Sequence, residues 1–219
     1  LGDGPAPLGG AVVETAQEKR DEETMSKQVE FWFDYGSPAS YIGYHGLKRV
    51  AARTGAEIVW KPMLLGGVFH AIESHSPMTV AAKGQWMLFD LKNHADRLGI
   101  PFELNPFFIF NTMPLMRGAL VAEERGEMEA YSDAVFDAVW RDKLNMGDPA
   151  VIGEVLARAG LDATAYLEGA QRPEIKDRLK ENTELAVKKG IFGAPSMFVG
   201  DKMWWGQDRL DWVEAELRG

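Results

Sequence analysis

The chain has 219 residues, 46% of them hydrophobic, so it can bury a sizeable core in one large domain or two closely packed ones. Its formal net charge of −9 and the lack of an apolar run of membrane-spanning length argue against nucleic-acid and membrane partners. The sequence contains no cysteine, which excludes disulfides, thiolate metal sites and a dithiol redox cycle run by the protein itself.

Residues 1–26 are predicted to form an N-terminal extension to which we assign no function. The segment is rich in Gly, Pro and Glu. It lacks the basic stretch followed by an apolar stretch that marks a secretory signal. We therefore expect a cytoplasmic protein whose folded part begins near residue 27.

The first folded segment is predicted to be a strand, a helix and a second strand. Residues 29–36, VEFWFDYG, form an aromatic and β-branched run that ends in turn residues, as a buried strand does. Ser37 is a good helix N-cap, and Pro38 suits the first helical position because its missing N–H costs nothing there. Residues 40–55 then predict a helix, and residues 57–65 a second strand parallel to the first. The helix is expected to bury Ile42, Leu47 and Val50.

The long middle of the chain, residues 67–189, shows helical periodicity and no strand signal. Helices are predicted over residues 77–99, 114–126, 127–143, 148–160, 162–170 and 173–190. The first of them offers several apolar side chains to the core, namely Trp86, Leu88, Phe89, Leu91 and Leu98.

Strand signals return at residues 196–199 and 202–205, and the Gly200-Asp201 pair between them is a favoured two-residue hairpin turn. Residues 208–217 predict a closing amphipathic helix. The element order is that of an α/β thioredoxin fold split by a large all-helical insertion. In this interpretation residues 27–66 and 190–219 form the thioredoxin-like domain, and residues 67–189 form the insertion.

Three separate segments resemble one family. Residues 34–41, DYGSPASY, resemble the D-[FY]-x-S-P-x-S-Y segment of the 2-hydroxychromene-2-carboxylate isomerases and kappa-class glutathione transferases. Residues 192–198, FGAPSMF, are similar to their F-G-x-P-x-x segment, and residues 205–210, WGQDRL, to their W-G-x-D-R segment. Because the resemblance runs in order through residues 29–217, it is more specific than any one motif.

This resemblance implies a DsbA-like fold, usually dimeric, that uses reduced glutathione as cofactor. The family reaction interconverts 2-hydroxychromene-2-carboxylate and trans-o-hydroxybenzylidenepyruvate, whereas the kappa-class relatives conjugate or reduce electrophiles. The implied partners are glutathione, a small aromatic carboxylic acid and a second copy of the chain.

The resemblance also implies a site. Ser37 would be the catalytic residue that holds the glutathione thiolate at a helix N-terminus. A cis Ala194-Pro195 bond would let the Ala194 backbone pair with glutathione like an added strand. The α-ammonium group of glutathione would bind Asp208, and the remaining cofactor contacts would come from Trp205, Gly206 and Gln207.

The residues by themselves leave more ordinary interpretations open. Ser37 can be no more than an N-cap, Asp208 a first-turn acid and Trp205 a core residue. Ser40, in the second cysteine position of a C-x-x-C motif, is expected to bond its own backbone. Sequence does not decide whether Ala194-Pro195 is cis or trans.

Residues 66–79, GGVFHAIESHSPMT, are predicted to be a loop. Family members hold glutathione there through an asparagine, and Ser74 stands at the expected position, which weakens the implied contact. His70 and His75 lie five residues apart without a supporting carboxylate pattern, so we expect solvated histidines and no metal site.

The apolar run Phe107, Phe108, Ile109 and Phe110, together with Met113, must be buried somewhere. A cap over an aromatic substrate, packing between the two subdomains and a dimer contact all remain open.

Three functions compete. A glutathione-dependent isomerase returns its thiol after each turnover. A kappa-class-like transferase or peroxidase acting on other electrophiles consumes it. A non-catalytic thioredoxin-like binding module would be unaffected by Ser37→Ala.

Overall fold

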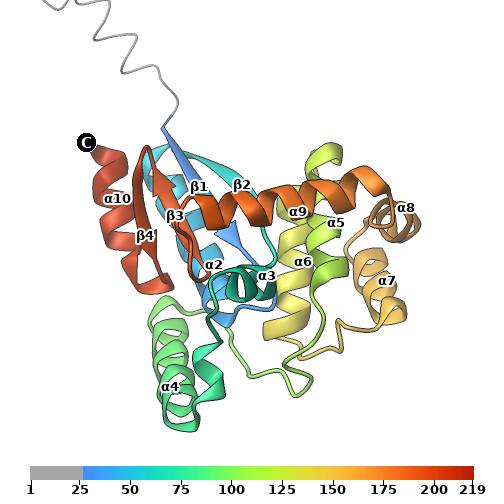
Figure 1. The fold of residues 1–219 in the computed structure, drawn as a ribbon, viewed down its shortest axis with the longest axis horizontal. Coiled ribbons are helices and arrows are strands. Elements are labelled where there is room, and N and C mark those ends of the chain that lie inside the picture. Colours follow the sequence, from blue (N-terminus) through green and yellow to red (C-terminus); the bar gives the residue numbers. More distant parts are fainter. Residues whose placement is uncertain (1–26) are drawn as a thin grey trace, which may run out of the picture.

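The computed structural model describes residues 27–219, and the extension predicted for residues 1–26 lies outside them (Figure 1). Four strands form one sheet in the order β2-β1-β3-β4. The strands are β1 (Gln28–Phe33), β2 (Glu57–Pro62), β3 (Ser196–Val199) and β4 (Lys202–Trp205). As predicted, β1 and β2 are parallel, and β3 and β4 form an antiparallel hairpin.

Helices separate the two halves of this sheet, which confirms the thioredoxin fold with a helical insertion. Between the paired strands β1 and β2 lies α2 (Pro38–Thr54). The chain then runs through α3 (Leu65–Ala71), the 3₁₀ turn η1 (Pro77–Thr79), α4 (Ala81–Leu98), α5 (Met113–Arg125), α6 (Met128–Trp140), α7 (Pro149–Arg158), α8 (Ala163–Gly169) and α9 (Pro173–Lys188). After the hairpin come the turn η2 (Gln207–Arg209) and α10 (Leu210–Arg218). None of the helices within residues 27–219 combines the length and apolarity needed to cross a bilayer.

The prediction of a loop throughout residues 66–79 was wrong at its start, because α3 occupies Leu65–Ala71. Its N-terminal N–H groups are bonded by distant side chains: Leu64 N–H donates to Thr183 Oγ1 at 3.0 Å and Leu65 N–H to Asp34 Oδ2 at 2.9 Å. Helix termini need such partners. No capping residue precedes α3 in sequence, so local capping rules could not find this helix.

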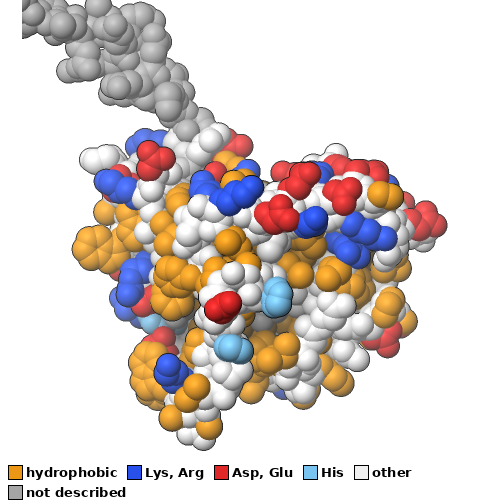
Figure 2. Space-filling view, viewed as in Figure 1, with side chains coloured by type: hydrophobic (Ala, Val, Ile, Leu, Met, Phe, Trp, Pro, Cys, Tyr) orange, Lys and Arg blue, Asp and Glu red, His pale blue; other side chains and the backbone are white. Residues whose placement is uncertain are grey.

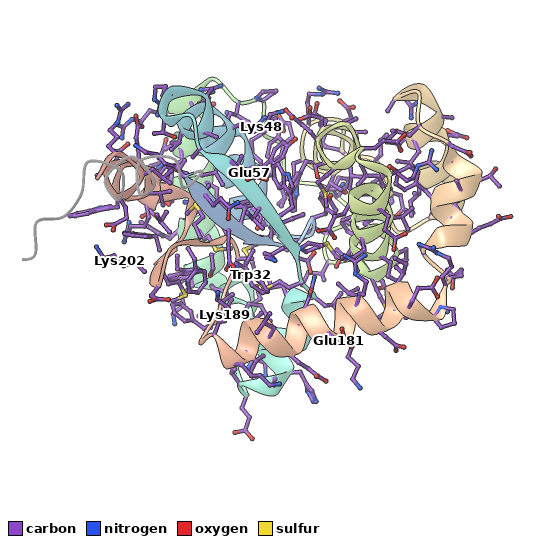
Figure 3. All side chains as sticks on the ribbon, turned by 90° about the horizontal axis from the view of Figure 1, so that it is seen from above. Trp32, Lys48, Glu57, Glu181, Lys189 and Lys202 are labelled. Atoms are coloured by element: carbon purple, nitrogen blue, oxygen red, sulfur yellow. The ribbon has the colours of Figure 1, made fainter. Side chains whose placement is uncertain are left out.

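Strand β1 divides the core between the two faces of the sheet, because successive side chains of a strand alternate. Val29, Phe31 and Phe33 are fully buried in the larger hydrophobic cluster, beneath α2. Trp32 points to the opposite face and joins a smaller cluster. On that face Lys189, just after α9, lies over the Trp32 ring with its Nζ 5.8 Å from the ring centroid (Figure 3).

The core predictions for α2 are confirmed, since Ile42, Leu47 and Val50 are buried. In α4 the prediction holds for Leu91 but is wrong for Trp86 and Phe89, whose side chains are each 65% exposed. Helix α4 stands at the edge of the molecule and packs mainly on α2 and η1 (Figure 1), so much of its surface stays exposed. Hydrophobic side chains gather over its outer side (Figure 2).

The apolar run before α5 is only partly buried. Phe108 and Phe110 pack against the main core, which supports packing between subdomains for these two side chains. Phe107 and Ile109 instead remain 49% and 72% exposed. The expectation that the whole run is buried is therefore wrong.

Candidate active site

Ser37 occupies the N-cap of α2, as predicted, and its hydroxyl makes two hydrogen bonds. Its Oγ accepts from Ser40 N–H at 3.1 Å and donates to the Ala194 carbonyl at 3.1 Å. The residue is only 4% exposed. Ser37 is therefore more than a helix cap, because it joins α2 to a segment 157 residues further along the chain.

The dipeptide Ala194-Pro195 connects the three segments that carry the resemblance. Its peptide bond is cis. The Ala194 carbonyl accepts from Ser37, and the Pro195 carbonyl accepts from Gly206 N–H at 3.0 Å. The start of α2, the chain before β3 and the chain after β4 therefore meet at one place, although they are far apart in sequence.

Glycines allow this close approach. A side chain at Gly43 would place its Cβ 2.9 Å from Pro195 Cγ, so α2 packs directly on the proline ring. At Gly193 a Cβ would lie 2.4 Å from Trp205 Nε1. Gly206 has a φ of 105°, which residues with a side chain rarely adopt.

Trp205 is not a core residue, contrary to the more ordinary interpretation of its sequence position. Its side chain is 47% exposed and lies over the Gly193 backbone. The Phe192 ring packs edge-on against it at 4.9 Å between centroids. Because both rings are partly exposed, they form an apolar wall open to solvent beside the Ala194-Pro195 dipeptide.

Asp34 is the main residue of this region to which the sequence pattern assigned no role. Only 3% exposed, it accepts from Gly36 N–H and Leu65 N–H, each at 2.9 Å, and from Thr112 Oγ1 at 3.2 Å. Burial raises the pKa of its carboxyl group, and these three donors act in the opposite direction. Asp34 ties the loop before Ser37 to the starts of α3 and α5. The available sequence signal was its place as the first residue of the DYGSPASY segment.

The first turn of α2 retains one backbone donor. Pro38 has no N–H, and Ser40 N–H is bonded to Ser37. Ala39 N–H has no acceptor among residues 27–219, and Ala39 is partly exposed. The Ser40 hydroxyl is fully buried and also lacks a partner in this described part, so the expectation that it bonds its own backbone was wrong.

Gln207 and Asp208 lie in the turn η2, which runs directly into α10, and not in the first turn of that helix. The Asp208 carboxylate pairs with the guanidinium of its neighbour Arg209. Gly206, which precedes the turn, bonds Pro195. Asp208 is therefore close in sequence to the joined segments but already has a cationic partner.

Ser74 lies apart from this cluster, in the exposed loop between α3 and η1, where its N–H donates to the Phe69 carbonyl. It lines a concavity of about 760 Å³ together with His70 and His75. None of the other predicted site residues lines it. Within residues 27–219 no group of three or more His, Cys, Asp or Glu side chains is placed to hold a metal ion.

The split four-stranded sheet, with the N-terminus of its first helix bonded to the Ala194-Pro195 segment, defines a thioredoxin-like protein of the DsbA type. The model of the DsbA-like thioredoxin domain matches residues 28–218. The chain is 30% identical over 195 residues to a 2-hydroxychromene-2-carboxylate isomerase of Sphingobium xenophagum, covering 88% of this chain and 99% of that protein. A solved structure of a 2-hydroxychromene-2-carboxylate isomerase is similar with a TM-score of 0.79 and 29% identity, over 86% of this chain and 93% of that one.

The chain therefore belongs to the 2-hydroxychromene-2-carboxylate isomerase family. It is also 28% identical over 211 residues to glutathione S-transferase kappa 1 of Homo sapiens, covering 89% of this chain and 92% of that protein. Its relatives are thus isomerases and glutathione transferases.

Proposed function

We propose that this protein is a glutathione-dependent isomerase that interconverts 2-hydroxychromene-2-carboxylate and trans-o-hydroxybenzylidenepyruvate or a related aromatic acid. The observation that carries the proposal is the Ser37 hydroxyl at the N-terminus of α2, bonded to Ala194 in a chain without cysteine. Reduced glutathione supplies the thiolate that adds to the conjugated acid, allows rotation about the former double bond and leaves again as free thiol.

The residues around Ser37 suit an anionic sulfur. The hydroxyl can redirect its proton from the Ala194 carbonyl while its oxygen keeps the bond to Ser40 N–H. Ala39 N–H, the donor without an acceptor in residues 27–219, lies in the first turn of the same helix. A helix N-terminus favours negative charge and lowers the pKa of a thiol. Ser37 is therefore a thiolate stabiliser and not a nucleophile.

The rest of a tripeptide fits the neighbouring groups. Ala194 N–H donates to no acceptor within residues 27–219, so it can pair with an extended peptide backbone. The exposed Trp205 ring would contact the tripeptide, and Gly206 and Gln207, the next two residues, would extend this contact surface. Asp208 would receive the α-ammonium group in competition with Arg209.

At the far end of this surface we assign Ser74 a single hydroxyl contact to the cofactor. Its exposed position in the loop after α3 leaves its side chain accessible to a ligand. This contact is the weakest part of the proposed cofactor site, because the concavity around Ser74 includes no other residue assigned to glutathione.

We also propose that the enzyme acts as a homodimer in the cytoplasm, where reduced glutathione is maintained. The exposed Trp86 and Phe89 of α4 support self-association, since large aromatic side chains are enriched in protein interfaces. Sedimentation of the wild type and of a Trp86→Ser/Phe89→Ser variant tests this part independently of catalysis.

The decisive experiment is calorimetric titration with reduced glutathione of the wild type, Ser37→Ala and Asp208→Ala. We expect saturable binding to the wild type and weaker binding to Asp208→Ala. In Ser37→Ala the pKa of the bound thiol, followed by ultraviolet absorbance of the thiolate, should rise. No binding to the wild type at millimolar glutathione would refute the proposal and favour a non-catalytic binding module.

A transferase or peroxidase that acts on other electrophiles is the second candidate, favoured by the similarity to glutathione S-transferase kappa 1. The amount of free thiol after many turnovers separates the two reactions. An isomerase leaves it unchanged, whereas a transferase or peroxidase consumes it in proportion to product.

A further inference from the structure

A second pocket shares Ala71 with the Ser74 concavity and lies where α9 packs on both α3 and α5. It has a volume of about 300 Å³, within the range of small-molecule sites. Its walls are mainly apolar and include Leu64, Met113, Leu179 and Val187. Three cationic side chains, Arg117, Lys176 and Lys180, also line it.

Arg117 is the unusual member of this set. It is half-buried, and its Nε atom is buried with no hydrogen-bond partner. No ion pair within residues 27–219 involves it. By contrast Arg172, just before α9, and Arg178 within α9 pair with Glu123 and Glu124 at the other end of α5. A guanidinium nitrogen buried without a hydrogen-bond partner is unfavourable. Arg117 is therefore placed for an anion that the chain does not provide.

The other charged groups of the pocket reinforce this positive character. Lys176 has no ion pair within the described residues. Lys180 is exposed and lies 3.8 Å from Glu184, the one acid in the lining. In a chain with a net charge of −9, a local excess of cations over an apolar wall favours an organic anion over a neutral ligand.

The pocket is linked to the candidate active site through Asp34. Leu64 precedes Leu65, and Met113 follows Thr112; both Leu65 and Thr112 donate to Asp34. Asp34 in turn accepts from Gly36 N–H, next to Ser37. Sequence neighbours of the pocket lining and of Ser37 are therefore bonded to one carboxylate.

We propose that this pocket binds the carboxylate of an apolar organic acid, with Arg117 as its counter-ion. The guanidinium fork suits a carboxylate, and the Leu and Met side chains suit an aromatic ring. The assignment of the bound acid as substrate rests on the proposed function. The binding itself requires only the pocket.

The test uses trans-cinnamate, an apolar aryl carboxylate, titrated calorimetrically into the full chain without glutathione. The variants are Arg117→Gln and the matched control Arg97→Gln, which removes the same charge from an exposed position of α4. Loss of a charge-assisted contact should weaken binding about tenfold or more in Arg117→Gln. Arg97→Gln should bind as the wild type does, and the neutral cinnamyl alcohol should bind more weakly than cinnamate.

Equal affinities of the wild type and Arg117→Gln for cinnamate, or no binding by the wild type, would overturn the inference. If Arg117→Gln does not fold, the double variant Lys176→Gln/Lys180→Gln replaces it. A cinnamate affinity of that variant equal to that of the wild type would also overturn the inference. Reduced glutathione is titrated into the same proteins. If cinnamate binding depends on Arg117 and glutathione does not bind, the pocket is supported and the proposed function is refuted. If glutathione binds and cinnamate binding does not depend on Arg117, only the pocket is refuted.

Discussion

The surroundings of Ser37 and the Arg117 pocket are linked through Asp34 but differ in how their polar groups are paired. The Ser37 hydroxyl has two protein partners, and the Asp34 carboxylate has three. The Arg117 guanidinium has none among the described residues. Polar groups bonded within the chain contribute to folding and fix geometry, whereas an unpaired, half-buried charge lowers stability until a ligand compensates it. The first region is therefore organised by folding, and the second is completed by binding.

The largest expected effect is at Asp34, which links the two regions. Asp34→Asn keeps the shape but turns an NH₂ group toward the N–H of either Gly36 or Leu65, so one part-buried donor loses its acceptor. We expect the free energy of unfolding to fall by about 3 kcal/mol, measured by urea denaturation. The exposed Asp177→Asn on α9 is the control and should change little. Equal stability of the two variants would mean that Asp34 does not join the regions.

The two serines of the first turn of α2 should behave in opposite ways. Ser37→Ala removes an N-cap and should cost about 1 kcal/mol. The Ser40 hydroxyl is buried without a partner, so Ser40→Ala should leave stability unchanged or raise it slightly. Thermal denaturation of both variants gives the comparison. A loss in Ser40→Ala as large as that in Ser37→Ala would show that Ser40 has a partner in solution.

Substitution of Arg117 should have the opposite effect and stabilise the free protein, because the unpaired charge lowers stability when no ligand is bound. Arg117→Met keeps the length of the side chain and removes the unpaired charge. We expect an increase of about 0.5–1 kcal/mol in the free energy of unfolding. Arg178→Met is the control, because Arg178 pairs with Glu123 and Glu124. Its free energy of unfolding should not increase. A destabilised Arg117→Met would show that the charge is compensated within the protein.

Sequence could predict what is local. The caps and breakers Ser37, Pro38 and Gly55 determine α2 from neighbouring residues, and the Gly200-Asp201 turn determines the hairpin. Helix α3 was missed because its N-terminal N–H groups bond Asp34 and Thr183, which are far away in sequence.

The site follows the same division. The motif placed Ser37, Ala194 and Gly206, and the structure brings them together through two hydrogen bonds. The resemblance assigned Trp205 to the cofactor site, with a core position as the ordinary alternative, and the side chain is half-exposed because Gly193 leaves room for its ring. Arg117 carries no motif, and its lack of a partner depends on how α3, α5 and α9 pack. No pattern along the chain encodes that arrangement.

The smallest expected effect is a pH dependence that reports on Asp34. Its carboxyl pKa is raised in the folded protein above the ordinary value of 3.8, so the folded state still binds a proton at pH values where the unfolded chain has lost it. The free energy of unfolding of the wild type should therefore fall as the pH rises from about 3.8 toward the raised pKa. Asn does not titrate, so the stability advantage of the wild type over Asp34→Asn should narrow in that window. An advantage that widens with pH would mean that the three donors outweigh burial, and that Asp34 is held as a carboxylate between Ser37 and the Arg117 pocket.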